Sequence, residues 1–377
     1  MRNKAIRTVL LLICVTFPTS VCLTAQGLFS SRSPVVNADK TVTFTLNAPN
    51  AGEVVLMLGS ENPRYPMTKG EDGRWSVTVG PLKPELYTYN IIVDGLRIVD
   101  PSNPEMQGGT APGSNLLDVP GDPPRFDQIQ DGPHGAVDIR TYFSKVQNVF
   151  RRVYIYTPPE YDTKTDKKYP VLYLRHGGGG NETSWYNEGR AGIIMDNLLA
   201  KNMAEPMLIV MMNGNVETGA AGGYNAEAME IVAKELFEDV IPLVEKNYRV
   251  YTDQKHRAVA GLSMGGGQSF YIGLKYVEKF DWLGVFSTGL FGGIQGASFN
   301  AEEYIPGLLT NPTKFNNELE LFYITVGEQD SRIEYTGNLV NTFREKRLDV
   351  VYETFPGNHE WRVWRESLYN FLPRLFR

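Results

Sequence analysis

The stretch that organises this chain is Val259-Ala260-Gly261-Leu262-Ser263-Met264-Gly265-Gly266-Gly267. Residues 258–260 are apolar and predict a buried strand, whereas residues 268–275 predict the start of a helix. The glycines between them allow a sharp turn in which strand and helix approach closely. Gly-x-Ser-x-Gly between a strand and a helix is typical of a nucleophile elbow, which exposes the Ser263 hydroxyl. The alternative is a glycine-rich turn with an incidental serine.

A serine nucleophile needs a general base, and in this strand–turn–helix setting the chain order is Ser, acid, His. The chain has four histidines. His134, His176 and His256 precede the elbow, and only His359 follows it. His359 comes between a strand predicted at residues 350–355 and the last helix, where catalytic groups gather in parallel sheets. By elimination, we expect His359 to take the Ser263 proton; a helix-capping or packing histidine is the alternative.

The imidazole needs a carboxylate that orients it. A strand predicted at residues 319–326 is followed by Gly327-Glu328-Gln329-Asp330. Asp330 is our choice for the acid and Glu328 is the rival, since either could face His359. The one that does not is expected to be a solvated loop acid.

The oxyanion of an acyl-transfer reaction needs two backbone donors. One is expected from the N–H of Met264, directly after the serine. The second is expected from the loop His176-Gly177-Gly178-Gly179-Gly180, where glycines permit close backbone approach. We assign Gly178, with Gly179 as the alternative. A phosphate-binding loop is a poor reading, because no Lys-Ser/Thr follows the glycines.

The N-terminus has the features of an export signal. A basic start is followed by an apolar run from Val9 to Cys22 and by Ala25, so residues 1–25 are expected to be a cleaved signal peptide and the product secreted or periplasmic. A retained anchor fits less well because the run is short and holds Pro18. Lipidation at Cys22, giving an outer-surface lipoprotein, stays open.

Composition limits the classes of function. Both cysteines lie in the signal, so the mature chain has no thiol for catalysis or metal binding. The formal charge of −6 becomes −9 when Arg2, Lys4 and Arg7 are removed with the signal. No basic run points to nucleic acid, and no stable membrane insertion is expected after cleavage.

Two domains are expected in 377 residues. Residues 26–119 show short alternating strands separated by turns, which predict a small all-β sandwich. Residues 120–134, rich in Pro, Gly and Asp, are the linker. Residues 135–377 alternate strands with helices and predict a doubly wound, mostly parallel α/β sheet covered on both faces. A helix on residues 229–240 is expected to bend near Pro242.

The C-terminal domain resembles the esterase-D-like branch of the α/β-hydrolases, within it the feruloyl and acetylxylan esterases of carbohydrate esterase family 1. The resemblance rests on residues 152–161, 176–180 with 182–185, 261–266, and 358–361 with Trp364. It implies a Ser–Asp–His triad at Ser263, Asp330 and His359, no metal or other cofactor, and secretion to act on esters of plant cell-wall polysaccharides.

The first domain resembles the early-set immunoglobulin-like modules related to glycogen-binding modules. Trp75, Tyr87 and Tyr89 could form a sugar platform. Their phase with the apolar faces of their strands favours core packing instead.

The predicted function is a secreted serine esterase that releases ferulate from arabinoxylan. Four loop residues could line its acyl pocket, although core packing is equally compatible with each: Trp185, Tyr224, Leu290 and Phe291. Acetylxylan deacetylation and hydrolysis of a siderophore ester are alternatives within the esterases. Acyl transfer to a sugar and non-catalytic glycan binding are alternatives from other classes.

Overall fold

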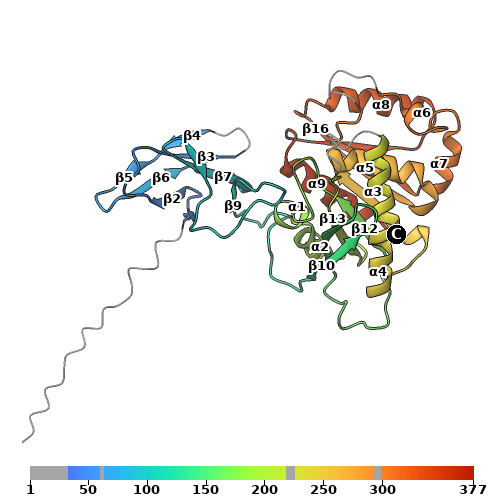
Figure 1. Cartoon of the computed structure of the whole chain (residues 1–377), viewed down its shortest axis with the longest axis horizontal. Coiled ribbons are helices and arrows are strands. Elements are labelled where there is room, and N and C mark those ends of the chain that lie inside the picture. The colour runs from blue at the N-terminus through green and yellow to red at the C-terminus, as the bar shows by residue number, and fades with distance from the viewer. Residues whose placement is uncertain (1–32, 60–62, 218–225, 292–298) are drawn as a thin grey trace, which may run out of the picture.

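The structure is a computed structural model that describes residues 33–59, 63–217, 226–291 and 299–377. The expected signal peptide lies outside the described residues. Figure 1 shows an all-β unit, coloured blue, beside a larger unit of helices and strands.

The all-β unit, hereafter the N-terminal unit, has two sheets with strand orders β1-β2-β6-β5 and β4-β3-β7-β8, and β9 pairs with β7. The strands of the first sheet are β1 (Val35–Val36), β2 (Val42–Asn47), β5 (Thr68–Lys69) and β6 (Arg74–Val79). Those of the second are β3 (Val54–Leu58), β4 (Arg64–Pro66), β7 (Glu85–Val93), β8 (Leu96–Ile98) and β9 (Asn115–Val119). Trp75 and Tyr89 are 8% and 1% exposed in a core made by both sheets, so they do not form a sugar platform. Tyr87 is half-buried at the edge of that core.

The larger unit is built on one eight-stranded sheet with the order β10-β11-β13-β12-β14-β15-β16-β17. The six strands β12 to β17 are parallel to one another, whereas β10 pairs antiparallel with β11 and β11 pairs antiparallel with β13. The predicted mostly parallel sheet is therefore confirmed. The strands are β10 (Ala136–Ser144), β11 (Val149–Thr157), β12 (Val171–Arg175), β13 (Leu208–Met212), β14 (Arg257–Leu262), β15 (Trp282–Phe286), β16 (Leu321–Gly327) and β17 (Val351–Phe355).

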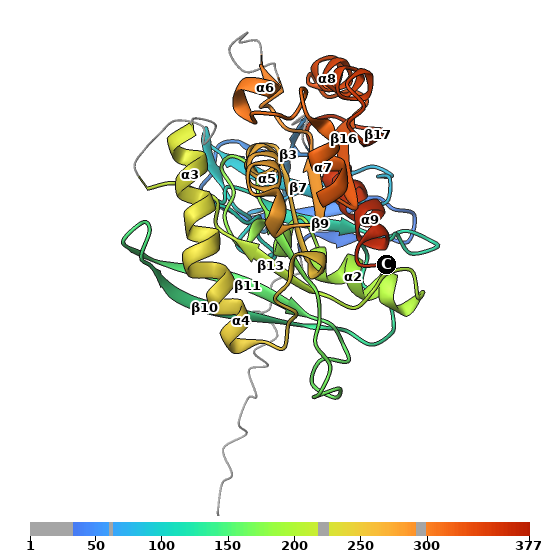
Figure 2. The ribbon, with the colours of Figure 1, turned by 90° about the vertical axis from the view of Figure 1, so that its right-hand side faces the viewer.

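Helices cover both faces of this sheet, as the two hydrophobic clusters on its faces require (Figure 2). The α-helices are α1 (Ser184–Asn187), α2 (Ala191–Ala200), α3 (Ala226–Glu235), α4 (Ile241–Asn247), α5 (Met264–Lys275), α6 (Ala301–Tyr304), α7 (Pro312–Glu318), α8 (Ile333–Glu345) and α9 (Trp361–Phe371). Short segments are η1 (Leu236–Val240), η2 (Gln254–His256), η3 (Val277–Lys279) and η4 (Leu372–Arg374). The π-helical η1 joins α3 to α4 directly before Pro242, where a bend was expected.

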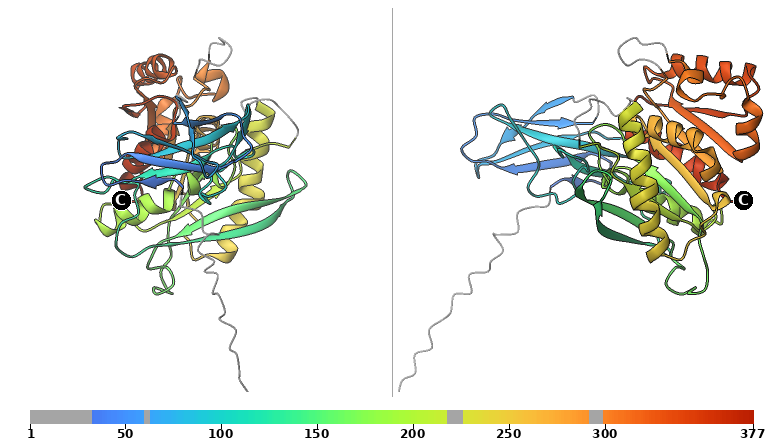
Figure 3. Two further views of the ribbon diagram at one scale, coloured as in Figure 1. Left: turned by 90° about the vertical axis from the view of Figure 1, so that its left-hand side faces the viewer. Right: turned by 45° about the vertical axis from the view of Figure 1, so that its right-hand side comes forward.

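The two units are joined by residues 120–135, which contain neither helix nor strand but are held by side chains. Asn197 on α2 donates to the carbonyls of Phe126 and Gln128, each at 2.8 Å. Arg365 on α9 donates to Glu85 of β7 and lies 2.7 Å from Asp127. Figure 3 shows the N-terminal unit against one end of the larger unit, on the side where α1 and α2 lie.

Candidate active site

Ser263 lies on a strained turn between β14 and α5. Its φ of 50° and ψ of −114° are conformations that residues with a side chain seldom adopt. A Cβ on Gly261 would lie 2.4 Å from the carbonyl oxygen of Gly265, and one on Gly265 would lie 2.3 Å from that of His176. The glycines are therefore required for the strand and helix to cross so closely. The helix also begins at Met264 rather than near Gln268, so Gly265, Gly266 and Gly267 lie at its start, whereas Gly261 belongs to β14.

The structure brings Ser263, His359 and Asp330 together. The Nε2 atom of His359 lies 2.9 Å from Ser263 Oγ, and its Nδ1 atom lies 2.7 Å from Asp330 Oδ2. These two contacts fix one tautomer, in which Nδ1 carries the proton and Nε2 can accept the serine proton. The Trp364 ring packs edge-on against the imidazole, with centroids 4.9 Å apart.

Asp330 is held ionised in a buried position. Its side chain is inaccessible to solvent, while Glu328 is exposed. Burial alone would raise the pKa of Asp330, but the hydrogen bond and charge of His359 and the donors of Arg332 outweigh it and lower the pKa. The backbone N–H and the Nη1 atom of Arg332 each lie 3.0 Å from Asp330 Oδ1. No pattern in the sequence around residue 332 indicates this role of Arg332.

The loops that carry Asp330 and His359 follow neighbouring parallel strands, β16 and β17, and are hydrogen-bonded to each other. The Gln329 N–H donates to the carbonyl of Gly357 at 3.0 Å, and the Gly357 N–H donates back to the Gln329 side chain at 2.6 Å. A Cβ on Gly327 would lie 2.4 Å from the same carbonyl. This pairing sets the acid–imidazole distance.

The glycine loop lies directly against the nucleophile. A Cβ on Gly177 would lie 2.6 Å from Leu262 and 3.1 Å from Ser263 Cβ. Residues 177–180 form a turn closed by a 3.1 Å hydrogen bond from Gly180 N–H to Gly177 carbonyl, with Gly179 at φ +76°. Among the described residues, the N–H groups of Gly178 and Met264 have no hydrogen-bond acceptor, so both are available as donors.

His176 supports this loop as a neutral imidazole. Its Nδ1 donates to the Gly177 carbonyl at 2.7 Å, and its Nε2 accepts the Gly214 N–H at 2.8 Å. Complete burial lowers the pKa of His176 to about 4. Sequence reasoning excluded His176 as the base but gave no role to it; its place inside the glycine motif was the available signal.

A buried polar chain extends this support beneath the elbow. Arg175 donates to the Gln268 side-chain oxygen at 3.0 Å, and Gln268 donates to the Gly214 carbonyl at 2.8 Å. Burial lowers the pKa of Arg175 to about 10. These hydrogen bonds connect the end of β12 to α5, and α5 to the loop after β13.

The four residues expected to line the acyl pocket have different positions. Trp185 is 1% exposed and its Nε1 donates to the Arg175 carbonyl at 2.8 Å, so it is a core residue and the expectation of a pocket wall is corrected. Phe291 is 5% exposed and packs edge-on against Phe270. Leu290 is half-buried on the loop after β15, and Tyr224 lies outside the described residues.

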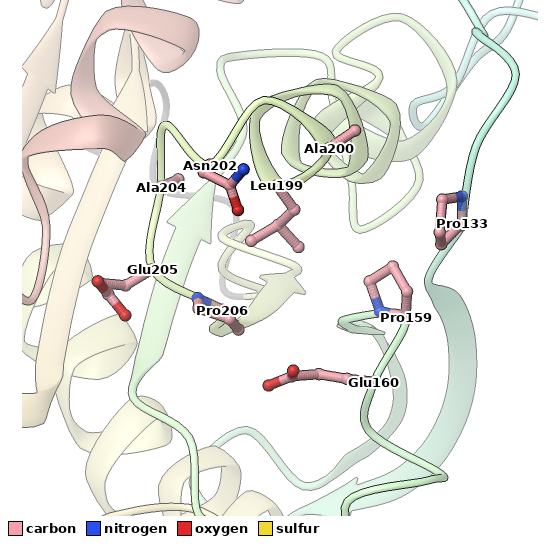
Figure 4. A pocket seen from close by; sticks show the side chains of 9 residues that line it. All are labelled: Pro133, Pro159, Glu160, Leu199, Ala200, Asn202, Ala204, Glu205 and Pro206. Carbon is pink, nitrogen blue, oxygen red and sulfur yellow. The ribbon is translucent and has the colours of Figure 1, made fainter.

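Two cavities lie away from the serine. One of about 520 Å³ is lined by Pro133 of the linker, by Pro159 and Glu160 after β11, and by residues from the end of α2 to the start of β13 (Figure 4). The other, of about 710 Å³, lies between the N-terminal unit and α1 and α2. In the parts of the chain that the structure describes, no three or more His, Cys, Asp or Glu side chains are grouped to hold a metal ion. Nor does any described helix have the length and apolar character needed to cross a membrane.

Comparisons with known sequences connect this geometry to a family. The sequence model of the Esterase family, described as "Putative esterase", matches residues 144–375. A relative from Xylanibacter ruminicola, named endo-1,4-beta-xylanase/feruloyl esterase, is 32% identical over 91% of this chain and 46% of its own length. The chain spans about half the length, or less, of this relative and of two other curated relatives that it matches.

Solved structures share the fold. A ferulic acid esterase is 26% identical, with a TM-score of 0.56, over 65% of this chain and 98% of its own. A ferulic acid esterase from Anaeromyces mucronatus is 24% identical, with a TM-score of 0.57, over 67% of this chain and 94% of its own. The enterobactin esterase of Shigella flexneri is 17% identical, with a TM-score of 0.62, over 88% of this chain and 92% of its own. The elbow, the sheet and the family match together show that this chain belongs to the Esterase family of α/β-hydrolases.

Proposed function

We propose that the chain is a serine carboxylic-ester hydrolase that works through Ser263, His359 and Asp330. The observation that carries the proposal is the continuous relay of 2.9 Å and 2.7 Å contacts from the strained serine to the buried carboxylate. Esterase family membership supports it.

The mechanism follows from the positions of these groups. Ser263 Oγ attacks the ester carbonyl as His359 Nε2 accepts its proton. The N–H groups of Met264 and Gly178 hydrogen-bond the oxyanion, Asp330 stabilises the imidazolium, and the imidazolium then protonates the leaving alcohol. Water, activated by the same imidazole, hydrolyses the acyl-enzyme and restores Ser263.

For the substrate, we propose a feruloyl ester of plant cell-wall arabinoxylan. The support is the 32% identical relative named as a xylanase and feruloyl esterase, together with the ferulic acid esterase structures. One solved neighbour contains ferulic acid. Hydrolysis of acetyl esters on xylan is the nearest alternative, since an acetyl esterase from Caldicellulosiruptor saccharolyticus is 23% identical over 55% of the chain.

A siderophore ester is a second candidate for a specific reason. The enterobactin esterase of Shigella flexneri aligns over 88% of this chain, whereas the ferulic acid esterases align over 65–67%. The longer alignment includes part of the N-terminal unit. We propose that this unit is an early-set immunoglobulin-like module, and its two-sheet core supports the proposal.

A substrate panel on the full chain tests these assignments. Methyl ferulate, acetylated xylan and a cyclic catecholate–serine triester are incubated with the protein, and the released acids are quantified. We expect kcat/KM to be greatest for methyl ferulate. Rapid acetate release without ferulate, or cleavage of the triester alone, would replace the feruloyl assignment but keep the esterase.

We also propose that residues 1–25 are removed on export. Sequencing the N-terminus of the protein recovered outside the cytoplasm is expected to give Gln26 as the first residue. A lipid-modified Cys22 at the N-terminus would instead identify a lipoprotein.

A further inference from the structure

Five residues of the N-terminal unit, Met106–Thr110, run along the glycine loop of the larger unit. We call this segment the strap. The Thr110 N–H and hydroxyl both donate to the Gly179 carbonyl, at 3.0 and 3.2 Å. The Gly109 carbonyl accepts from the Asn181 side chain at 2.9 Å, and the Gly109 N–H donates to Thr183 Oγ1 at 3.1 Å.

Further along, the strap is bonded to α1 and to the residue that follows it. The Gly108 N–H donates to Glu188 Oε2 at 2.8 Å, and the Asn187 side chain donates to the Met106 carbonyl at 3.1 Å. Hydrogen bonds therefore connect the strap to the larger unit at several points, from the glycine loop to the residue after α1.

The strap backbone lies close against the larger unit, and two strap residues have no room for a side chain. A Cβ on Gly109 would lie 2.6 Å from the Gly179 carbonyl oxygen, and Gly109 has φ +116°. A Cβ on Gly108 would lie 2.5 Å from Thr183 Oγ1. The nearby Gly113 is different: its Cβ would meet only the Ala111 carbonyl, at 4.0 Å.

The strap contacts one side of the oxyanion turn at residues 177–180, and His176 contacts the other. His176 holds the Gly177 carbonyl and Thr110 holds the Gly179 carbonyl, with Gly178 between them. Gly178 itself is exposed and would have open space around a Cβ, so its own environment does not fix it. The Gly178 N–H belongs to the same peptide group as the Gly177 carbonyl, which accepts from His176 and from the Gly180 N–H. The Gly180 N–H belongs in turn to the peptide group whose carbonyl, that of Gly179, accepts from Thr110, so both contacts set the direction of the Gly178 N–H.

We propose that the strap positions the oxyanion turn, so that a segment of the N-terminal unit is part of the apparatus that stabilises the transition state. Thr110 and Gly109 are positioning residues that act through the Gly178 N–H. This inference rests on the proposed ester hydrolysis. A donor fixed in advance spends no free energy on reorientation as the oxyanion forms, so loosening it lowers kcat more than it weakens substrate binding.

The strap can be perturbed without separating the two units. Arg190 bonds Asp118 at 2.7 Å, and Arg365 bonds Glu85 and lies 2.7 Å from Asp127. None of these contacts involves residues 106–110 or 177–181. The Arg190 and Arg365 contacts are therefore expected to hold the two units together when the strap is displaced.

The test compares Gly109→Ala with Gly113→Ala in the full chain, using the ester that the wild type hydrolyses fastest. The readouts are kcat, KM, the inhibition constant of a trifluoromethyl ketone analogue of that ester, the inhibition constant of the product acid, and the melting temperature. For Gly109→Ala we expect kcat to fall about 10- to 100-fold, since small misplacements of a catalytic donor have effects of this size.

The pattern of the other readouts separates positioning from general damage. The trifluoromethyl ketone forms an oxyanion on Ser263, so its inhibition constant should rise by the same factor as kcat falls. KM and the inhibition constant of the product acid should stay within about twofold, and Gly113→Ala should match the wild type. Thr110→Val, at an exposed position, should give a smaller change in the same direction.

Three results would contradict the account in distinguishable ways. An active wild type whose kcat is unchanged by Gly109→Ala and Thr110→Val overturns the strap's role and leaves the esterase standing. Equal losses in binding of the ketone and of the product acid, with a lowered melting temperature, assign the strap a structural role only. A wild type that hydrolyses no ester overturns the proposed function, and the strap's role with it.

Discussion

At the residue scale, the choice between Asp330 and Glu328 shows where sequence reasoning stopped. Both follow β16, and nothing in Gly327-Glu328-Gln329-Asp330 indicates which carboxylate turns inward. The structure places Asp330 beside His359 with two Arg332 donors, and leaves Glu328 exposed. The deciding contact, the reciprocal Gln329–Gly357 pair, joins residues 28 positions apart, which no local pattern shows.

These positions predict opposite outcomes for two conservative variants. Asp330→Asn should lower kcat about 10³- to 10⁴-fold with little change in KM, because the amide favours the wrong imidazole tautomer. Glu328→Gln, the matched control two residues away, should stay within about twofold. Steady-state kinetics on both variants check this. A large loss in Glu328→Gln with an active Asp330→Asn would reverse the assignment.

At the element scale, the elbow helix shows both the reach and the limit of the sequence. Gly-x-Ser-x-Gly predicted the turn, but residues 264–267 read as loop because glycine is a poor helix former. The helix begins at Met264 because packing against the ends of β12 and β15 overrides propensity: Cβ atoms on Gly265 and Gly266 would lie 2.3 Å and 3.0 Å from backbone oxygens there.

A matched pair of helix glycines tests this. Gly265→Ala places its Cβ against the His176 carbonyl and should lower the free energy of unfolding by more than about 3 kcal/mol, or abolish folding. Gly337→Ala on α8 meets its nearest atom, the Tyr352 hydroxyl, at 3.8 Å and should be neutral or stabilising by up to about 1 kcal/mol. Denaturant titration measures both. Similar values for the two variants would refute the steric explanation.

In the eight-stranded sheet, β10 is a strand that sequence reasoning did not predict. It is an edge strand, with Ile139 and Phe143 exposed at 53% and 44% beside polar neighbours, so it lacks the continuous apolar run of the central strands. The strands predicted at residues 258–260 and 319–326, which are β14 and β16 in the structure, are buried on both faces and therefore mostly apolar. Only Tyr142 and Ser144 of β10 are buried, so its apolar pattern is too weak to predict a strand.

At the scale of the whole molecule, two buried groups connect stability to pH in opposite directions. Burial raises the pKa of Glu188, at the strap contact, to about 7 despite the opposing hydrogen bonds and Arg365 charge, and burial lowers the pKa of His176 to about 4. Between pH 4.5 and 6.5 the folded state binds more protons at Glu188 than the unfolded state, and fewer at His176. As pH rises through that window, Glu188 reduces stability and His176 increases it, each on the order of 3 kcal/mol.

Glu188→Gln removes one of these two opposing effects. Its amide oxygen can still accept the Gly108 N–H, but it does not titrate. The melting temperature of the variant should therefore rise more steeply with pH from 4.5 to 6.5 than that of the wild type. Calorimetric scans across this window check the slope, and parallel curves for the two proteins would show that Glu188 does not titrate there.

The proposed mechanism requires Ser263 to carry the acyl group between ester and water. The most direct measurement is to quench the full chain in acid during turnover of methyl ferulate, determine its intact mass, and map any adduct by peptide sequencing. We predict one feruloyl group, attached to the peptide containing Ser263 and absent from Ser263→Ala, which should lose at least about 10⁴-fold in kcat. Turnover by Ser263→Ala at the wild-type rate, or an adduct on another residue, would contradict it.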